Sequence, residues 1–103
     1  MYNNSVIINE LVNNICIRKT IQNLENIGLF AEPTARGGDP HNVANTLWKA
    51  LDASQANLEY LLGAKNATVL DGELDGVAER IFGLNGLKDI AMQILESLDK
   101  GIL

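Results

Sequence analysis

Residues 39–63 of the chain, DPHNVANTLWKALDASQANLEYLLG, decide the fold class. Asp39 is a favourable N-cap, because its carboxylate accepts hydrogen bonds from the free amides of a first helical turn. Pro40 follows at the first helical position, where its fixed φ angle suits a helix. Gly63 stands where a left-handed residue commonly ends a helix. The segment therefore predicts a helix over residues 40–62.

Small and apolar residues recur along this segment at alternating spacings of three and four, so they share one face of the predicted helix. That face consists of Ala44, Leu47, Leu51, Ser54, Leu58 and Leu61. The opposite face, which we expect to meet solvent, consists of Asn45, Lys49, Asp52, Ala56 and Glu59. Within the apolar face, Ser54 either lets a neighbouring backbone come close or bonds back to its own helix.

The segment from Ser5, a candidate N-cap, to Gly28 predicts a helix over residues 5–27 whose apolar face changes side along its length. The N-terminal apolar set is Ile7, Ile8, Leu11, Val12, Ile15 and Cys16. The C-terminal set, nearly opposite, is Ile17, Ile21, Leu24 and Ile27, and Arg18 is expected on the solvent side there. Either the helix breaks near Asn14, or one continuous helix is buried on different faces. A short strand over residues 15–17 would have nothing to pair with.

The C-terminal third predicts two further helices, over residues 70–82 and 86–100. The first is defined by an amphipathic set, Leu74, Val77, Ala78, Ile81 and Phe82. Thr68 or Asp71 caps its start, and Gly83 interrupts the pattern before it resumes and ends at Gly101. One helix kinked at Gly83 is the alternative. Between the first two helices, residues 28–39 are expected to form a loop.

Length and composition favour a single all-α domain over residues 1–103. The chain is too short to build two cores. Hydrophobic residues make up 47% of it but aromatic residues only 5%, so the core is expected to be aliphatic, which suits packed helices. The expected architecture is an irregular bundle of about four helices, at 5–27, 40–62, 70–82 and 86–100.

Charge and hydropathy argue against several classes of partner. Eight basic residues are outnumbered by thirteen acidic ones, and the net charge is −5, so neither nucleic acid nor an anionic membrane is an expected partner. No stretch approaches the roughly 20 apolar residues of a membrane span, and the N-terminus lacks the pattern of a signal peptide. Cys16 is the only cysteine, which fits a reducing compartment. We therefore expect a cytoplasmic protein.

The residues that chemistry most often uses do not form a recognisable catalytic, cofactor or metal site. His41, the only histidine, stands in a first helical turn, which favours an ordinary surface residue over a phospho-acceptor. Residues 71–76 begin like a calcium loop, but the twelfth position is Phe82 instead of glutamate. Cys16 lies on an apolar face, which favours a buried thiol over a nucleophile. No serine stands on a nucleophile elbow.

These observations predict a non-catalytic, cytoplasmic interaction protein, an adaptor, regulator or inhibitor that acts through a helical face, and not an enzyme. The two apolar sets of the first helix offer more surface than a monomer readily buries, which predicts a homodimer. The expected interface consists of Ile7, Ile8, Leu11, Val12, Ile15 and Trp48. Two alternatives stay open: a ligand-binding or sensor domain with Ser54 and Trp48 lining its pocket, and a phage or mobile-element inhibitor. No cofactor is expected.

Overall fold

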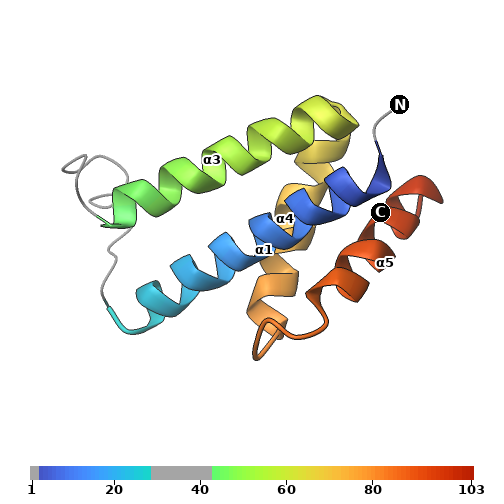
Figure 1. The fold of residues 1–103 in the computed structure, drawn as a ribbon. Coiled ribbons are helices and arrows are strands. Elements are labelled where there is room, and N and C mark those ends of the chain that lie inside the picture. Colours follow the sequence, from blue (N-terminus) through green and yellow to red (C-terminus); the bar gives the residue numbers. More distant parts are fainter. Residues whose placement is uncertain (1–2, 29–42) are drawn as a thin grey trace.

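The computed structural model describes residues 3–28 and 43–103 of the 103-residue chain, and these ranges form an all-α fold without strands (Figure 1). α1 covers Asn4–Asn26, α3 covers Val43–Leu62, α4 covers Ala64–Arg80 and α5 covers Leu87–Asp99. The expected irregular bundle is confirmed, and α4 and α5 are two helices instead of one kinked helix. Asp39, Pro40 and His41, together with the loop expected after Gly28, lie outside the described residues.

The helix ends follow local chemistry, with two corrections. Asn3, and not Ser5, is the N-cap of α1, because Asn3 Oδ1 accepts a hydrogen bond from the Ser5 amide at 2.7 Å. Gly63 ends α3 as predicted, with φ +92°, but α4 begins at the next residue instead of at residue 70. Thr68 and Asp71 therefore lie within α4 and cap nothing, and the Thr68 hydroxyl donates to the Ala64 carbonyl at 2.9 Å.

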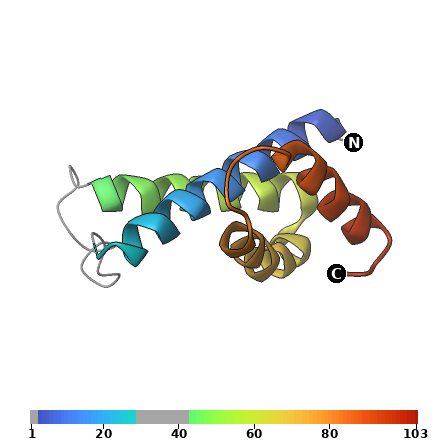
Figure 2. The same cartoon turned by 90° about the horizontal axis from the view of Figure 1, so that it is seen from below.

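α1 is the helix around which the others are arranged. It lies beside α3 in Figure 1, and α4 crosses behind it. Seen from below in Figure 2, α4 runs nearly end-on beneath α1 and α3, and α5 lies against the N-terminal half of α1. α1 therefore contacts each of the other three helices, and its buried residues decide how they meet.

An aliphatic core fills the space between the N-terminal half of α1, α4 and α5, and Leu58 of α3 completes it. Its buried members are Ile7, Leu11, Ile15, Leu58, Ala67, Leu70, Leu74, Val77, Ala78, Leu87, Ala91, Ile94 and Leu95. On α3 the predicted inward positions Leu51, Ser54 and Leu58 are indeed buried. Asn45, predicted to face solvent, is buried too, whereas Lys49, Asp52, Ala56 and Glu59 are exposed as expected.

α1 buries the same face along its whole length. That face seemed to change side in the sequence only because two of its inward residues are polar. α1 is one continuous helix, so the predicted alternative of a break near Asn14 is wrong. Asn14 and Arg18 are both buried, and Arg18 was expected in solvent. The buried positions 7, 11, 14, 18 and 21 are spaced by four, three, four and three residues, which is one straight seam. The apparent reversal arose from counting apolar residues alone.

This seam removes the geometric basis of the predicted dimer interface. Ile7, Leu11 and Ile15 are buried by other helices of the same chain. Ile8 and Val12 are half-buried against the same core. The structure therefore places these five side chains wholly or partly against the chain's own core, and their role in an interface stays a prediction. Homodimerisation itself also stays a prediction.

Candidate functional site

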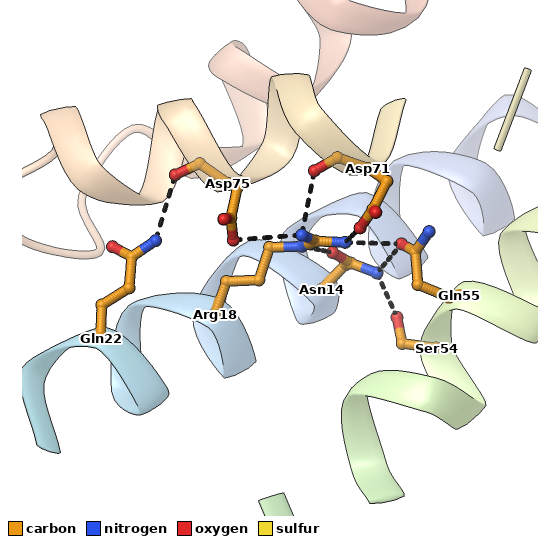
Figure 3. A network of polar contacts seen from close by, with 7 residues as sticks. All are labelled: Asn14, Arg18, Gln22, Ser54, Gln55, Asp71 and Asp75. Atoms are coloured by element: carbon orange, nitrogen blue, oxygen red, sulfur yellow. Dashed lines mark hydrogen bonds and ion pairs between the residues drawn. The ribbon is translucent and has the colours of Figure 1, made fainter. Parts of the chain in front are cut away.

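Arg18 lies at the centre of a polar network that joins α1, α3 and α4 (Figure 3). Its Nε donates to Asn14 Oδ1 at 2.6 Å. Its Nη1 donates to the Asp71 carbonyl at 3.0 Å and to Asp75 Oδ1 at 3.2 Å. Its Nη2 donates to Gln55 Oε1 at 3.0 Å and to Asp71 Oδ1 at 2.7 Å. A guanidinium group has five N–H donors, so these contacts occupy all of them.

Asn14 extends the network from Arg18 to α3. Its Nδ2 donates to Ser54 Oγ at 3.0 Å and to Gln55 Oε1 at 2.7 Å. The Ser54 hydroxyl in turn donates to Glu10 Oε2 at 2.7 Å. Ser54 thus bonds across to α1, and not back to its own helix as one sequence interpretation had it. We call the set drawn in Figure 3, namely Asn14, Arg18, Gln22, Ser54, Gln55, Asp71 and Asp75, the Arg18 network.

The two sides of the ion pairs differ sharply in exposure. The Arg18 side chain is 4% exposed, whereas those of Asp71 and Asp75 are each 63% exposed. A buried cation is costly unless it is paired and fully hydrogen-bonded, and α4 meets that need with carboxylates held at its surface. The carboxylates keep much of their hydration, so the pair avoids part of the desolvation cost of two buried ions.

Glu10, next to the Arg18 network, is a titratable group whose ionisation is favoured by hydrogen bonds from neighbouring side chains. Partial burial alone would raise its pKa, but hydrogen bonds donated by Ser54, Asn13 and Asn57 outweigh burial and lower the pKa below the usual value of 4.5. The Asn57 amide lies 2.8 Å from Glu10 Oε1. Glu10 therefore stays charged at neutral pH and ties the N-terminal part of α1 to α3.

The Arg18 network borders a cleft of about 310 Å³. Side chains of α1, α3 and α4 line it: Arg18, Ile21, Gln22, Glu25, Trp48, Leu51, Asp71 and Asp75. One wall is apolar, since Ile21 and Leu51 are buried and Trp48 is half-buried beside them. The carboxylates of Glu25, Asp71 and Asp75 also line the cleft. We call this space the Trp48 cleft.

The structure brings some of the predicted candidate residues together and separates others. Asp71 and Asp75 both contact Arg18, and no group of side chains suited to hold a metal ion occurs in residues 3–28 and 43–103. Cys16 is half-buried, and this burial raises the pKa of its thiol. Trp48 lines the cleft, whereas Ser54, the other predicted pocket residue, lies in the network.

Asn14 and Arg18 are the residues that the sequence analysis missed. Arg18 was assigned by polarity to the outside of the helix, and Asn14 was considered only as the position of a possible break. The available signal was their spacing, because position 14 follows Leu11 by three and position 18 precedes Ile21 by three. A polar residue at an inward position of a long seam is a known device for fixing which helices pair.

A second feature lies on the turn between α4 and α5. Phe82 was expected inside an amphipathic helix, but α4 ends at Arg80, and the extended backbone of Ile81, with ψ of 146°, leads the chain outward. Phe82 is 105% exposed and Leu84 is 59% exposed. We call these two side chains the Phe82 tip. Arg80, two residues before Phe82, is one of the side chains of α4 and α5 that line an open hollow of about 180 Å³, and buried Val77 and Ile94 line it too.

No known family, curated protein or solved structure matches this chain. In the described part of the chain, each helix is too short or too polar to cross a membrane.

Proposed function

We propose that the chain is a small, non-catalytic, cytoplasmic protein-interaction protein that forms a homodimer through the Phe82 tip. The observation that carries the proposal is the full exposure of Phe82, with Leu84 next to it. Aromatic side chains dominate binding energy at protein interfaces, usually by filling a pocket. A fully exposed phenylalanine on a turn between two well-packed helices is suited to that role.

The hollow beside the tip supports a second copy as the occupant. Its volume is about 180 Å³, and an apolar cavity of about 150 Å³ is enough for a benzene molecule. Val77, Ile90, Ile94 and Leu103 supply apolar lining, and Arg80 and Gln93 stand among the polar lining residues. A projecting ring and a receiving hollow on neighbouring parts of one surface are self-complementary, as a twofold interface requires.

Charge around the tip fits association of like copies. Glu79 and Arg80 precede it and Lys88 and Asp89 follow it, and all four are exposed. Their formal charges cancel, so two copies of this surface would not repel each other as two surfaces of net charge −5 would. The single cysteine, Cys16, is consistent with the cytoplasmic location included in the proposal.

Light scattering at micromolar concentration tests the proposal. The wild-type chain should show about twice the monomer mass of 11.2 kDa, and Phe82→Ser should reduce it to the monomer. Val69→Ser is the matched control, because Val69 is an exposed apolar residue of α4 that lies away from the tip and the hollow.

A second variant addresses the hollow without touching the tip. Gln93 is exposed and lines the hollow, so Gln93→Trp should block it and prevent dimerisation while the fold is retained. A wild-type mass of 11.2 kDa, or a Phe82→Ser variant that remains dimeric, would refute the proposed interface. Circular dichroism of each variant confirms that the helices are intact.

A further inference from the structure

The Trp48 cleft is a candidate ligand site independent of the Phe82 tip. Ligand pockets usually measure about 300–1,000 Å³, and the cleft, at about 310 Å³, is at the small end of that range. Residues from three helices line it, and none of them belongs to the tip or the hollow. Its size limits the ligand to a small molecule, and its lining decides the chemistry of that molecule.

The positive charge that Arg18 contributes to the cleft is not available to an anionic ligand. All five N–H donors of Arg18 already bind Asn14, Gln55, Asp71 and Asp75. A phosphate or carboxylate entering the cleft would have to break one of these contacts. It would also approach the carboxylates of Asp71 and Asp75, which line the same space.

The negative charge in the cleft, in contrast, is only partly neutralised. Arg18 contacts Oδ1 of Asp71 and Oδ1 of Asp75, and both side chains remain 63% exposed. Glu25 contributes a third carboxylate to the lining. Asp71 and Asp75 together carry two negative charges against the one positive charge of Arg18, and this excess attracts a cation and strengthens hydrogen bonds that an ammonium group donates.

The apolar residues of the lining suit the carbon skeleton of such a cation. Ile21 and Leu51 provide buried aliphatic surface, and Trp48 lies beside them in the lining. Tryptophan is the aromatic residue that attracts cations most strongly. We propose that the Trp48 cleft binds a small organic cation, an alkylammonium or guanidinium compound, between this apolar wall and the carboxylates of Asp71 and Asp75.

The fluorescence of Trp48, the only tryptophan of the chain, reports on binding directly. Cadaverine is the probe, and the uncharged diol of the same chain length is its control. Cadaverine should produce a saturable change with a dissociation constant of about 1 mM or below, and added salt should weaken it. The diol should produce no saturable change.

Variants separate the cleft from general charge attraction. Asp75→Asn keeps an acceptor for Arg18 but loses the charge, so it should raise the dissociation constant about tenfold. Asp99→Asn removes the same charge from an exposed site on α5 outside the cleft and should leave the constant unchanged. Phe82→Ser should also leave it unchanged, which keeps this test distinct from that of the dimer.

Four results from the wild type and the first pair of aspartate variants would overturn the proposal. They are the absence of a saturable change with cadaverine, an equal response to the diol, a response to inorganic phosphate instead of cadaverine, and equal weakening by Asp75→Asn and Asp99→Asn. If Asp75→Asn also lowers the melting temperature, Glu25→Gln provides the second variant. Glu25 also lines the cleft, so unchanged cadaverine affinity in Glu25→Gln together with a wild-type constant for Asp75→Asn would also refute the site.

Discussion

The N-terminal half and the middle of α1 use the same helix face to bury opposite kinds of side chain. Ile7, Leu11 and Ile15 enter an aliphatic core with α4 and α5. Asn14 and Arg18 enter a hydrogen-bonded network with α3 and α4. Burial of apolar surface stabilises a fold but is not directional, whereas each bond to Arg18 requires particular partner atoms. The comparison suggests a division of labour, in which the aliphatic half contributes most stability and the polar middle fixes the helix register.

Truncation of side chains in the aliphatic core should give the largest loss of stability. Leu11→Ala and Leu58→Ala each remove a side chain with no exposed surface. Each should reduce the free energy of unfolding by about 2–5 kcal/mol, through lost burial and the cavity left behind. Urea denaturation measures the loss, with Leu84→Ala as an exposed control that should change little. Unchanged midpoints for both buried variants would contradict the assigned core.

Substitution in the polar middle of α1 should reduce the free energy of unfolding by a smaller amount, and a second substitution should restore most of it. Arg18→Met keeps much of the volume but leaves the buried Asn14 Oδ1 without its donor, at a cost of about 1–3 kcal/mol. Adding Asn14→Leu removes that orphaned group, so the double variant should regain most of the stability. Urea denaturation of both variants tests this, and a double variant less stable than Arg18→Met would show that the network does more than satisfy its own members.

If the network fixes register, the recovered stability should come with a loss of order. The double variant should retain its helical circular dichroism but show broader amide resonances in NMR spectra than the wild type. Polar residues at inward positions specify helix pairing in some systems and not in others, so sharp, dispersed spectra from the double variant would assign Arg18 no such role here.

Substitution of Asp71, at the exposed edge of the Arg18 network, should reduce the free energy of unfolding by less still. Asp71→Ala removes one acceptor of Arg18 Nη2, but water can reach that site because Asp71 is 63% exposed. We expect a loss of about 0.5–1.5 kcal/mol, and Asp71→Asn, which keeps the acceptor, should lose less. Thermal unfolding distinguishes the two. Equal losses would mean that charge, and not the hydrogen bond, holds Arg18.

The smallest expected effect is the loss of stability in acid that follows from protonation of Glu10. The pKa of Glu10 is lowered in the folded chain, so its contribution is fully present above the unfolded value near 4.5 and is lost as pH falls through the folded value. The stability difference between the wild type and Glu10→Gln should therefore shrink on acidification below pH 4.5. Glu59→Gln, at an exposed position of α3, is the control. A difference that is independent of pH would contradict the role given to the Ser54 and Asn57 hydrogen bonds.

The helices and most of the core were predictable from the sequence, because glycines and apolar spacing act locally. Gly28, Gly63 and Gly101 all adopt the positive φ angles expected of residues that end helices. Leu51 and Leu58 face inward as their spacing predicts. The burial of Asn14 and Arg18 was not predictable from polarity, because it depends on acceptors 37–57 residues further along the chain. Likewise, the exposure of Phe82 follows from where α4 ends, which its own apolar character does not reveal.

The position of α1 at the centre of the bundle has a consequence for synthesis on the ribosome. α1 leaves the ribosome first, but its core partners on α5 extend to Leu95. At about 5–20 residues per second, several seconds separate the two helices. During that interval the side chains of Ile7 and Leu11 lack the cover that α5 later provides. Nascent chains arrested before α5 should therefore bind holdase chaperones, and release should coincide with the emergence of α5.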